Sequence, residues 1–301
     1  MEMTIRNMVT EYLKFCQFRK ELDEKTLKAY RIDLRQFFDF CDSADPSREK
    51  IEEYVTELHR QYKHKTVKRK IASIKAFYHY LEEEEIIEEI PFRKESFILP
   101  RIIPRVEIEK LLNCMYAQYE RLDGLARKLW LRDMAVVEMF FATGARVSEI
   151  SNIQKNNIDL TSGLLCIEGK GDKERYVQIG DEDVLTLLRE YYSENAEDIE
   201  KCGSFFVNIR GKRFTEQSIR GMLKRHAKQA GIERKLTPHM FRHSLATYLI
   251  EEGVDISFVQ QILGHSSIRT TQIYIHVAAG KQAEILKEKH PRKNMRIQST
   301  F

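Results

Sequence analysis

Hydrophobic side chains recur every three to four residues through most of the first 82 positions, which is the period of an amphipathic helix. This pattern predicts four helices, at about residues 4–20, 25–41, 49–62 and 66–82. The apolar side of the second is formed by Leu27, Tyr30, Leu34, Phe37 and Phe38. A polar cluster at residues 42–46 separates it from the third helix. The first part of the chain is therefore predicted to be a small four-helix domain.

The apolar period stops between residues 91 and 105, where three of the six prolines lie. Proline removes a backbone donor and disfavours helix at the residue before it, so this stretch is predicted to be an extended linker. A chain of 301 residues is long for one core and suits two domains. We place a helical domain at 1–95, a linker at 96–105, a second domain at 106–280 and a tail at 281–301.

The second domain mixes two periods. Helices are predicted at about residues 107–119, 125–142, 147–153, 183–194 and 215–230, and short strands at 158–160, 164–168 and 175–179. Residues 169–172 are predicted to form a hairpin turn with Lys170 at its tip, and residues 143–145 are predicted to break the long apolar helix just before Arg146. The predicted fold class is mainly α, with a small antiparallel β-sheet in the second domain.

Residues 238–276 concentrate polar side chains that a core does not need. Pro238 after Thr237 is a helix-start signal. His239 and Arg242 are three residues apart, so a helix places them on one face near its positive end, which suits a phosphate.

A second helix in this stretch has an apolar side made by Phe258, Val259, Ile262 and Leu263. Gly264 is predicted to end that helix, which hands His265 to a turn. Tyr274 follows nine residues later. Two imidazoles, a guanidinium and a phenol therefore come from one segment.

Simpler interpretations exist for each of these residues. His239 and His243 are four apart, as in helical zinc ligands, but no Glu stands beside His239 and no Cys or Asp pair is near to complete a metal site. Tyr274 lies between Ile273 and Ile275, where half-buried packing is the ordinary expectation. The sequence indicates no metal and no cofactor.

Cations gather in the last part of the predicted four-helix domain. Between residues 58 and 81 there is no Asp or Glu, and the Lys and Arg residues are Arg60, Lys63, Lys65, Lys68, Arg69, Lys70 and Lys75. A cationic patch without acids is the footprint expected for a phosphate backbone, so these seven residues are the predicted DNA contacts. The alternative is a solvated helix face.

Composition narrows the class of protein. Hydrophobic residues make up 42% and charged residues 32%, and the net charge is +4, which favours a polyanion partner only weakly. No apolar run approaches the roughly 18 residues that a membrane span needs, and the acids near the N-terminus argue against a signal peptide. The five scattered cysteines suit a reducing cytoplasm better than a set of disulfides.

These motifs resemble the tyrosine recombinase (phage integrase) family. The resemblance rests on Arg146 in ATGARVSEI, Lys170 in GKGDKER, His239 and Arg242 in TPHMFRHSLAT, His265 in LGHSSIRTT and Tyr274 in QIYIH. It covers residues 105–276 closely, and the first domain resembles the family's core-binding domain by pattern. The length is that of the short Xer-like members.

The resemblance implies a reaction and a role for each residue. Tyr274 attacks a DNA phosphate and forms a 3′-phosphotyrosyl ester, which stores the bond energy while strands move. Arg146 and Arg242 stabilise the charge on the phosphate oxygens, and Lys170 protonates the leaving oxygen. His239 is the expected base for the tyrosine proton, and His265 is expected to hydrogen-bond a phosphate oxygen.

The same resemblance implies double-stranded DNA with inverted half-sites as substrate and a tetramer on two sites, with the tail at 281–301 exchanged between protomers. A tail packed on its own domain is the alternative. Whether a second recombinase or an accessory protein takes part is left open. Two other functions also stay open at this point, namely type IB topoisomerase-like relaxation and DNA binding without catalysis.

Overall fold

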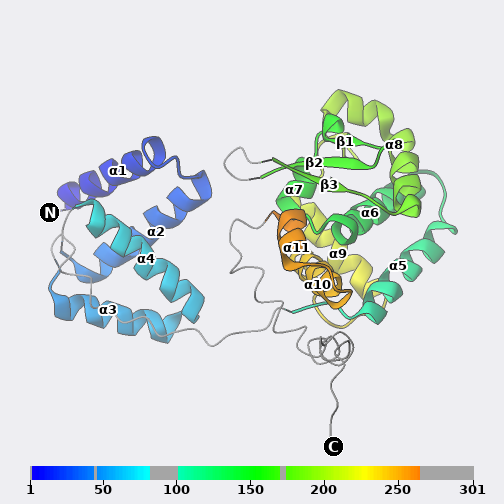
Figure 1. Cartoon of the computed structure of the whole chain (residues 1–301). Helices are drawn as coiled ribbons and strands as arrows, with labels where there is room; N and C mark the ends of the chain where they lie inside the picture. The colour runs from blue at the N-terminus through cyan, green and yellow to red at the C-terminus, as the bar shows by residue number, and fades with distance from the viewer. Residues whose placement is uncertain (1, 44–45, 82–100, 170–173, 265–301) are drawn as a thin grey trace, which may run out of the picture. The chain divides into compact units, whose positions relative to one another are not determined.

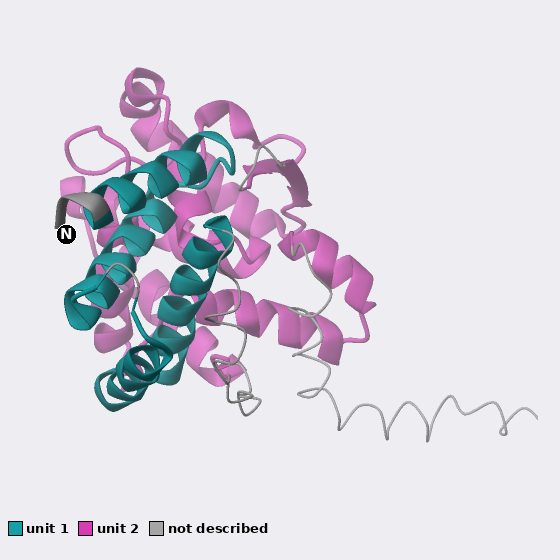
Figure 2. Cartoon of the chain, turned by 90° about the vertical axis from the view of Figure 1, so that its left-hand side faces the viewer, with its two compact units in different colours: residues 1–96 teal, residues 97–301 magenta. Residues whose placement is uncertain are grey.

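The computed structural model describes residues 2–43, 46–81, 101–169 and 174–264 (Figure 1). The chain divides into two compact units, Met1–Ser96 and Phe97–Phe301 (Figure 2). The predicted fold class is confirmed, because the described residues are mostly helical and carry one small antiparallel sheet. None of the helices in the described ranges is long and apolar enough to cross a membrane.

Unit 1 contains the four helices that the hydrophobic period predicted. They are α1 (Glu2–Phe18), α2 (Glu24–Cys41), α3 (Arg48–Gln61) and α4 (His64–Tyr80). Side chains fix two of the starts: Asp23 accepts the N–H of Thr26 at 2.8 Å, and Ser47 caps α3 through the N–H of Lys50. Asp42 ends α2 in the left-handed conformation.

The core of unit 1 is aromatic. Phe37 of α2 meets Tyr54 of α3 and Tyr78 of α4 edge-on, with ring centroids 5.3 and 6.2 Å apart. Phe77 packs in the same way against Tyr12 of α1. Edge-to-face pairs of this kind add to the stabilisation that burial provides, so rings from all four helices close one core.

Unit 2 begins with α5 (Arg105–Tyr119), α6 (Gly124–Thr143) and α7 (Val147–Asn152). The short helix η2 (Lys155–Asn157) leads into β1 (Ile158–Asp159), β2 (Leu164–Glu168) and β3 (Glu174–Gln178). After the strands come α8 (Glu182–Cys202), α9 (Glu216–Gln229), α10 (Pro238–Glu251) and α11 (Ile256–Leu263). Strands β1, β2 and β3 pair antiparallel in that order, with Cys166 opposite Tyr176.

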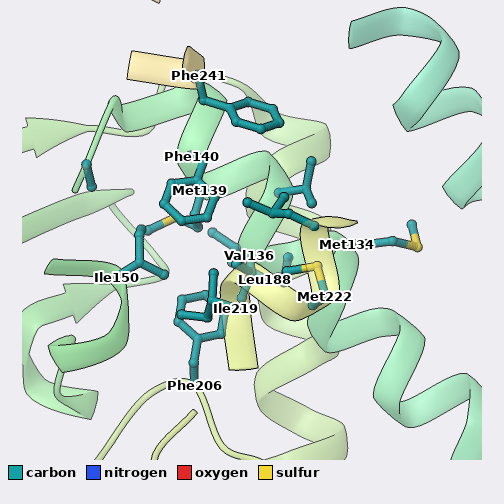
Figure 3. Close-up of a cluster of buried hydrophobic side chains, with 14 of the residues drawn as sticks. Met134, Val136, Met139, Phe140, Ile150, Leu188, Phe206, Ile219, Met222 and Phe241 are labelled. Carbon is teal, nitrogen blue, oxygen red and sulfur yellow. The ribbon is translucent and has the colours of Figure 1, made fainter. Parts of the chain in front are cut away.

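Helix α6 forms the centre of unit 2 because it is apolar on nearly every side. Residues 134–140 are all buried, and α6 packs against α5, α8 and α10. Figure 3 shows Met139 and Phe140 of this helix among side chains from α7, α8, α9 and α10. Phe140 stacks on Phe241 of α10 at 5.9 Å. A helix that is hydrophobic all round must be covered on all sides, so it fixes where α10 lies.

The chain enters unit 2 along α10. Ile103 is fully buried, and its N–H donates to Ser244 Oγ at 2.8 Å. The hydroxyl of Tyr248 donates to the carbonyl oxygen of Ile103, at 2.5 Å. Arg105 then binds Glu252 at the end of α10 at 2.8 Å. Ile103 and Arg105 therefore fasten the chain to α10 at the start of α5.

Two details differ from the prediction. Helix α8 continues to Cys202, eight residues past the predicted end, because Asn195 and Ile199 face the core within an otherwise acidic stretch. In α11 only Val259 and Leu263 are buried, whereas Phe258 is 61% exposed and does not belong to the packed face. The predicted turn at residues 169–172 lies almost wholly outside the described residues.

Candidate active site

Arg146 lies at the start of α7, directly after the break that ends α6. Gly144 adopts the left-handed conformation, with φ of +61°. A Cβ atom at this position would lie 2.6 Å from Leu263 Cδ2 and 3.0 Å from Leu245 Cδ2, so a larger residue would displace both leucines and strain the backbone. The tight turn brings the start of α7 against α10 and the end of α11.

Arg242 is the buried member of the predicted set, with 3% of its surface exposed. Its Nη1 donates to the carbonyl oxygen of Gly144 at 2.8 Å, and its Nη2 donates to the carbonyl oxygen of Leu263. A buried guanidinium needs such acceptors, and here they come from the α6–α7 turn and from the end of α11. Arg242 therefore joins the turn that carries Arg146 to the helix that precedes His265.

His239 stands at the N-terminal end of α10, one turn before Arg242, and its side chain is exposed. Pro238 occupies the first turn as predicted, but the hydroxyl of Thr237 makes no capping hydrogen bond. His239 is thus on the surface at the end of the helix where N–H groups point outward. The structure brings Arg146, His239 and Arg242 onto adjoining elements.

His243 is half-buried in α10. Burial, together with the nearby charges of His239 and Arg242, lowers its pKa to about 4. The imidazole is therefore neutral at pH 7. Within the described ranges, no group of three or more His, Cys, Asp or Glu side chains is placed to hold a metal ion.

Glu149 is a residue of this site that the sequence analysis did not identify. Its Oε2 accepts the backbone N–H of Arg146 and its Oε1 accepts Arg146 Nη1, both at 2.7 Å. Arg175 of β3 binds the same carboxylate with two N–H groups, at 3.0 and 2.8 Å. Burial would raise the pKa of Glu149, but these contacts outweigh it and lower the pKa to about 2. The motif RVSE did carry a signal, because an acid three residues after a helix start is a capping pattern.

Lys170, His265 and Tyr274 lie outside the described residues, so their predicted roles stay predictions. Tyr248, the other tyrosine of the 238–276 segment, is described. It is half-buried, and its hydroxyl is bound to the carbonyl of Ile103. Burial raises its pKa, which makes it a poor nucleophile.

The seven cations predicted to contact DNA are divided by the structure of unit 1. Arg60, Lys63, Lys65, Lys68 and Arg69 are exposed, and Lys75 is half-buried. Lys70 was wrongly placed with them: its side chain is 3% exposed. Its ammonium group donates to Asp33 Oδ1 at 3.0 Å and to Gln36, and it lies over the ring of Tyr62.

The partner that removes Lys70 from the surface is Asp33 of α2, which is fully buried. Asp33 also accepts the hydroxyl of Ser73 at 2.9 Å and binds Arg69, whose side chain keeps 45% of its surface exposed. Buried charges require partners of this kind, so the network ties α2 to α4. Lys65 and Lys68 remain exposed beside it on α4.

A second basic surface, which the sequence analysis did not predict, lies in unit 2. A groove of about 1040 Å³ extends from α9 to Val147 and His239. Its lining includes one acid, Glu233, and the cations Arg220, Lys224, Lys228, Arg234 and Lys235. We call it the α9 groove. The four-residue spacing of Arg220, Lys224 and Lys228 in the sequence was the signal that could have revealed it.

Comparison with known proteins gives the family. Residues 105–281 match the "Phage integrase family", and residues 9–85 match the "Phage integrase, N-terminal SAM-like domain". The chain is 45% identical over 300 residues to a tyrosine recombinase of Agathobacter rectalis, covering 96% of this chain and 98% of the relative.

Two further similarities agree. The chain is 33% identical to the tyrosine recombinase XerD of Listeria innocua, over 96% of this chain and all of the relative. The fold matches XerH, a site-specific recombinase solved with its palindromic difH substrate after cleavage, with a TM-score of 0.73 at 23% identity. That match covers 93% of this chain and 84% of XerH. The chain therefore belongs to the phage integrase family of tyrosine recombinases, which are DNA strand-transferring enzymes.

Proposed function

We propose that this chain recombines DNA at specific sites by cutting and rejoining strands through a covalent bond between Tyr274 and phosphorus. The observation that carries the proposal is the buried Arg242, which is bound to the Gly144 carbonyl beside Arg146 and lies one helical turn from the exposed His239. Family membership supports the same reaction.

The reaction exchanges one phosphate ester for another. The phenol oxygen of Tyr274 bonds to phosphorus while the bond to the 5′ oxygen of the next nucleotide breaks. His239 takes the phenol proton, and Lys170 gives a proton to the leaving oxygen. The products are a 3′-phosphotyrosine and a free 5′-hydroxyl, which attacks in the reverse sense to rejoin a strand. No cofactor is consumed.

The arginines supply electrostatic stabilisation. Negative charge builds up on the non-bridging oxygens in the transition state, and a guanidinium matches two such oxygens with a planar pair of N–H groups. Arg242 is already held by two carbonyl oxygens, so its orientation costs little entropy when DNA binds. Arg146 is 39% exposed at its side chain and is held by Glu149. His265 donates to a further phosphate oxygen.

DNA is bound by both units in this proposal. In unit 1 the exposed Lys65 and Lys68 lie on α4, with Arg69 beside them. In unit 2 the α9 groove leads to His239. Both surfaces would contact phosphates, because they carry many cations and few acids.

Recombination needs two sites at once. We propose inverted half-sites, one protomer on each, and a tetramer that closes when residues 281–301 of each protomer dock on the next. Deleting residues 281–301 is expected to leave binding to one site intact and to abolish pairing of two sites. Recombination at full rate by the truncated chain would place the protomer link elsewhere. A cytoplasmic location suits the five free thiols, since all five described cysteines are unpaired.

The test is capture of the covalent intermediate. Duplexes that bind the full chain are first selected from a randomised pool, and a nick is placed next to the cleaved position so that the leaving strand diffuses away. The wild-type chain is expected to give an adduct that survives denaturing electrophoresis. Tyr274→Phe should bind equally well and give none, whereas Tyr248→Phe is the matched control and should still give adduct.

The same assay separates the alternatives. A DNA-binding protein without catalysis gives no adduct with the wild-type chain. A type IB topoisomerase gives adduct and relaxes supercoiled DNA with no preference for the selected sequence. Exchange of strands between two selected sites, dependent on Tyr274, is the result expected of a recombinase.

A further inference from the structure

Arg175 of β3 makes a set of contacts that is unusually complete for one side chain. Two of its N–H groups bind the two oxygens of Glu149, and Nε donates to the carbonyl oxygen of Ile262 at 3.0 Å. Its side chain is only 11% exposed. Because the guanidinium of Arg175 is already paired with a carboxylate, we assign its effect to its neighbours and not to a direct contact with a substrate.

Those neighbours belong to the candidate site. Glu149 holds Arg146 through both its backbone N–H and its Nη1. Ile262 lies in the last turn of α11, and a Cβ atom at the following Gly264 would be 2.7 Å from Arg175 Cδ. A side chain at position 264 would therefore displace Arg175 and would also require a strained backbone, because Gly264 has a φ of +62°.

The charges of Arg146, Glu149 and Arg175 determine how strongly this group of side chains attracts a phosphate. Arg146 and Glu149 alone form a pair with no net charge, and such a pair attracts a phosphate weakly. Arg175 adds a second positive charge to the same buried carboxylate, which leaves the triad Arg146–Glu149–Arg175 with a formal net charge of +1. In a partly buried site this difference is screened much less than in water.

We propose that Arg175 is a positioning residue that neutralises Glu149, so that Arg146 keeps an effective positive charge toward the scissile phosphate while its guanidinium stays fixed. The proposal rests on the proposed function, because it assigns Arg146 to the phosphate. It differs from a purely structural ion pair in one respect: the benefit depends on the negative charge of the substrate.

The test compares two substrates in the covalent-adduct assay with the selected, nicked duplex. One carries the ordinary phosphate at the cleaved position. The other carries a methylphosphonate there, in which a methyl group replaces one non-bridging oxygen and removes its negative charge. Arg175→Gln is expected to slow adduct formation on the ordinary phosphate roughly 10- to 100-fold, the range for loss of a charged hydrogen bond. On the methylphosphonate its loss relative to wild type should be less than about fivefold, because no negative charge needs the added positive potential.

Two further variants separate charge from shape. Arg175→Lys keeps the charge without the planar fork, and should lose less than Arg175→Gln on the ordinary phosphate. The double variant Glu149→Gln, Arg175→Gln restores the net charge of +1 and should recover part of the rate that Arg175→Gln loses. Arg189→Gln is the matched control, since Arg189 also binds a carboxylate and a backbone carbonyl, in α8. It should form adduct at the wild-type rate.

The outcomes are distinguishable. Equal losses on both substrates, with no recovery in the double variant, would reduce Arg175 to a structural contact and overturn the proposal. A wild-type rate for Arg175→Gln would also overturn it. Thermal unfolding of each variant checks that it folds. If Arg175→Gln does not fold, the double variant is compared with the wild-type chain on the two substrates instead. Absence of adduct with the wild-type chain would instead refute the proposed function.

Discussion

Arg242 and Gly144 are 98 residues apart in the chain and are joined by a hydrogen bond of 2.8 Å from Nη1 to the carbonyl oxygen. The bond is buried, and the same guanidinium also binds the carbonyl of Leu263. One side chain therefore fixes the turn before Arg146 and the end of α11 at the same time. A substitution that keeps the positive charge of Arg242 but loses its planar pair of N–H groups should therefore affect both catalysis and stability.

Arg242→Lys is expected to lower the rate of adduct formation about 100-fold, since an ammonium cannot hold two carbonyls and a phosphate in one plane. The buried carbonyl left without a donor should also cost about 1–3 kcal/mol of stability. Adduct assays and urea unfolding measure the two effects. Arg127→Lys, at an exposed pair in α6, should change neither; if Arg242→Lys behaves like it, the two carbonyls do not depend on the fork.

Replacing the leaving 5′ oxygen by sulfur tests the proton donor. A thiolate leaves without protonation, so Lys170→Ala should fail on ordinary DNA and recover on the sulfur substrate. Arg146→Ala and Arg242→Ala should stay inactive on both, because their charge acts on the non-bridging oxygens. If all three variants respond alike to the sulfur substrate in single-turnover cleavage, Lys170 is not the general acid.

The exposed face of α4 should contribute to DNA affinity through its charge. Lys65→Glu with Lys68→Glu is expected to weaken binding to all sequences and to reduce the slope of log K against log salt by about 0.9 per lost phosphate contact. Lys14→Glu with Lys28→Glu changes the net charge equally on exposed positions of α1 and α2. Equal weakening in both double variants would mean that only the net charge of unit 1 matters.

Asp33 should be the most sensitive polar residue of unit 1. Asp33→Asn leaves the buried ammonium of Lys70 without a countercharge, which typically costs about 3–5 kcal/mol. Urea unfolding, followed by circular dichroism, measures the loss. Asp39→Asn in the same helix removes an exposed pair with Arg35 and should cost less than about 0.5 kcal/mol. A loss below about 1 kcal/mol for Asp33→Asn would show that Gln36 and Tyr62 suffice for Lys70.

Stability should fall in mild acid because of His243. Its pKa is about 4 in the folded chain and 6.5 in the unfolded chain, so the unfolded chain binds more protons between these values. The contribution is present above pH 6.5 and is lost as the pH falls toward 4. His243→Gln should therefore flatten the decline in unfolding free energy between pH 6.5 and 4.5. Glu149, with a pKa of about 2, adds its own loss only below pH 4.5. Parallel declines in wild type and variant would contradict the assignment.

The hydrophobic period predicted the helices well because most of them have one buried face. The two stops at Gly144 and Gly264 were located by the glycines themselves, at positions where positive φ and close contacts disfavour a side chain. The hydrophobic period could not predict the contacts of Glu149 with Arg175, which is 26 residues away on a strand. That pairing depends on how β3 lies against α7 and α11, which no local pattern encodes.

The prediction that Lys70 contacts DNA failed for a different reason. Its charge groups it with its basic neighbours, but it stands three residues after Val67 and beside Ile71, on the apolar stripe of α4. Asp33 occupies the matching stripe of α2, three residues after Tyr30. A lysine and an aspartate on two facing apolar stripes predict a buried pair, so the position of a charged residue in the hydrophobic period decides its burial more than its charged neighbours do.

The attachment of Ile103 to Ser244 and Tyr248 has a mechanical consequence. A load that travels along the backbone toward α5 reaches α10 at these bonds, and it reaches Glu107 of α5 through Arg234, which binds the carbonyl of Ile102. Helix α10 carries His239 and Arg242. Tension along the backbone is therefore borne in part by the helix that holds two of the residues expected to meet the phosphate.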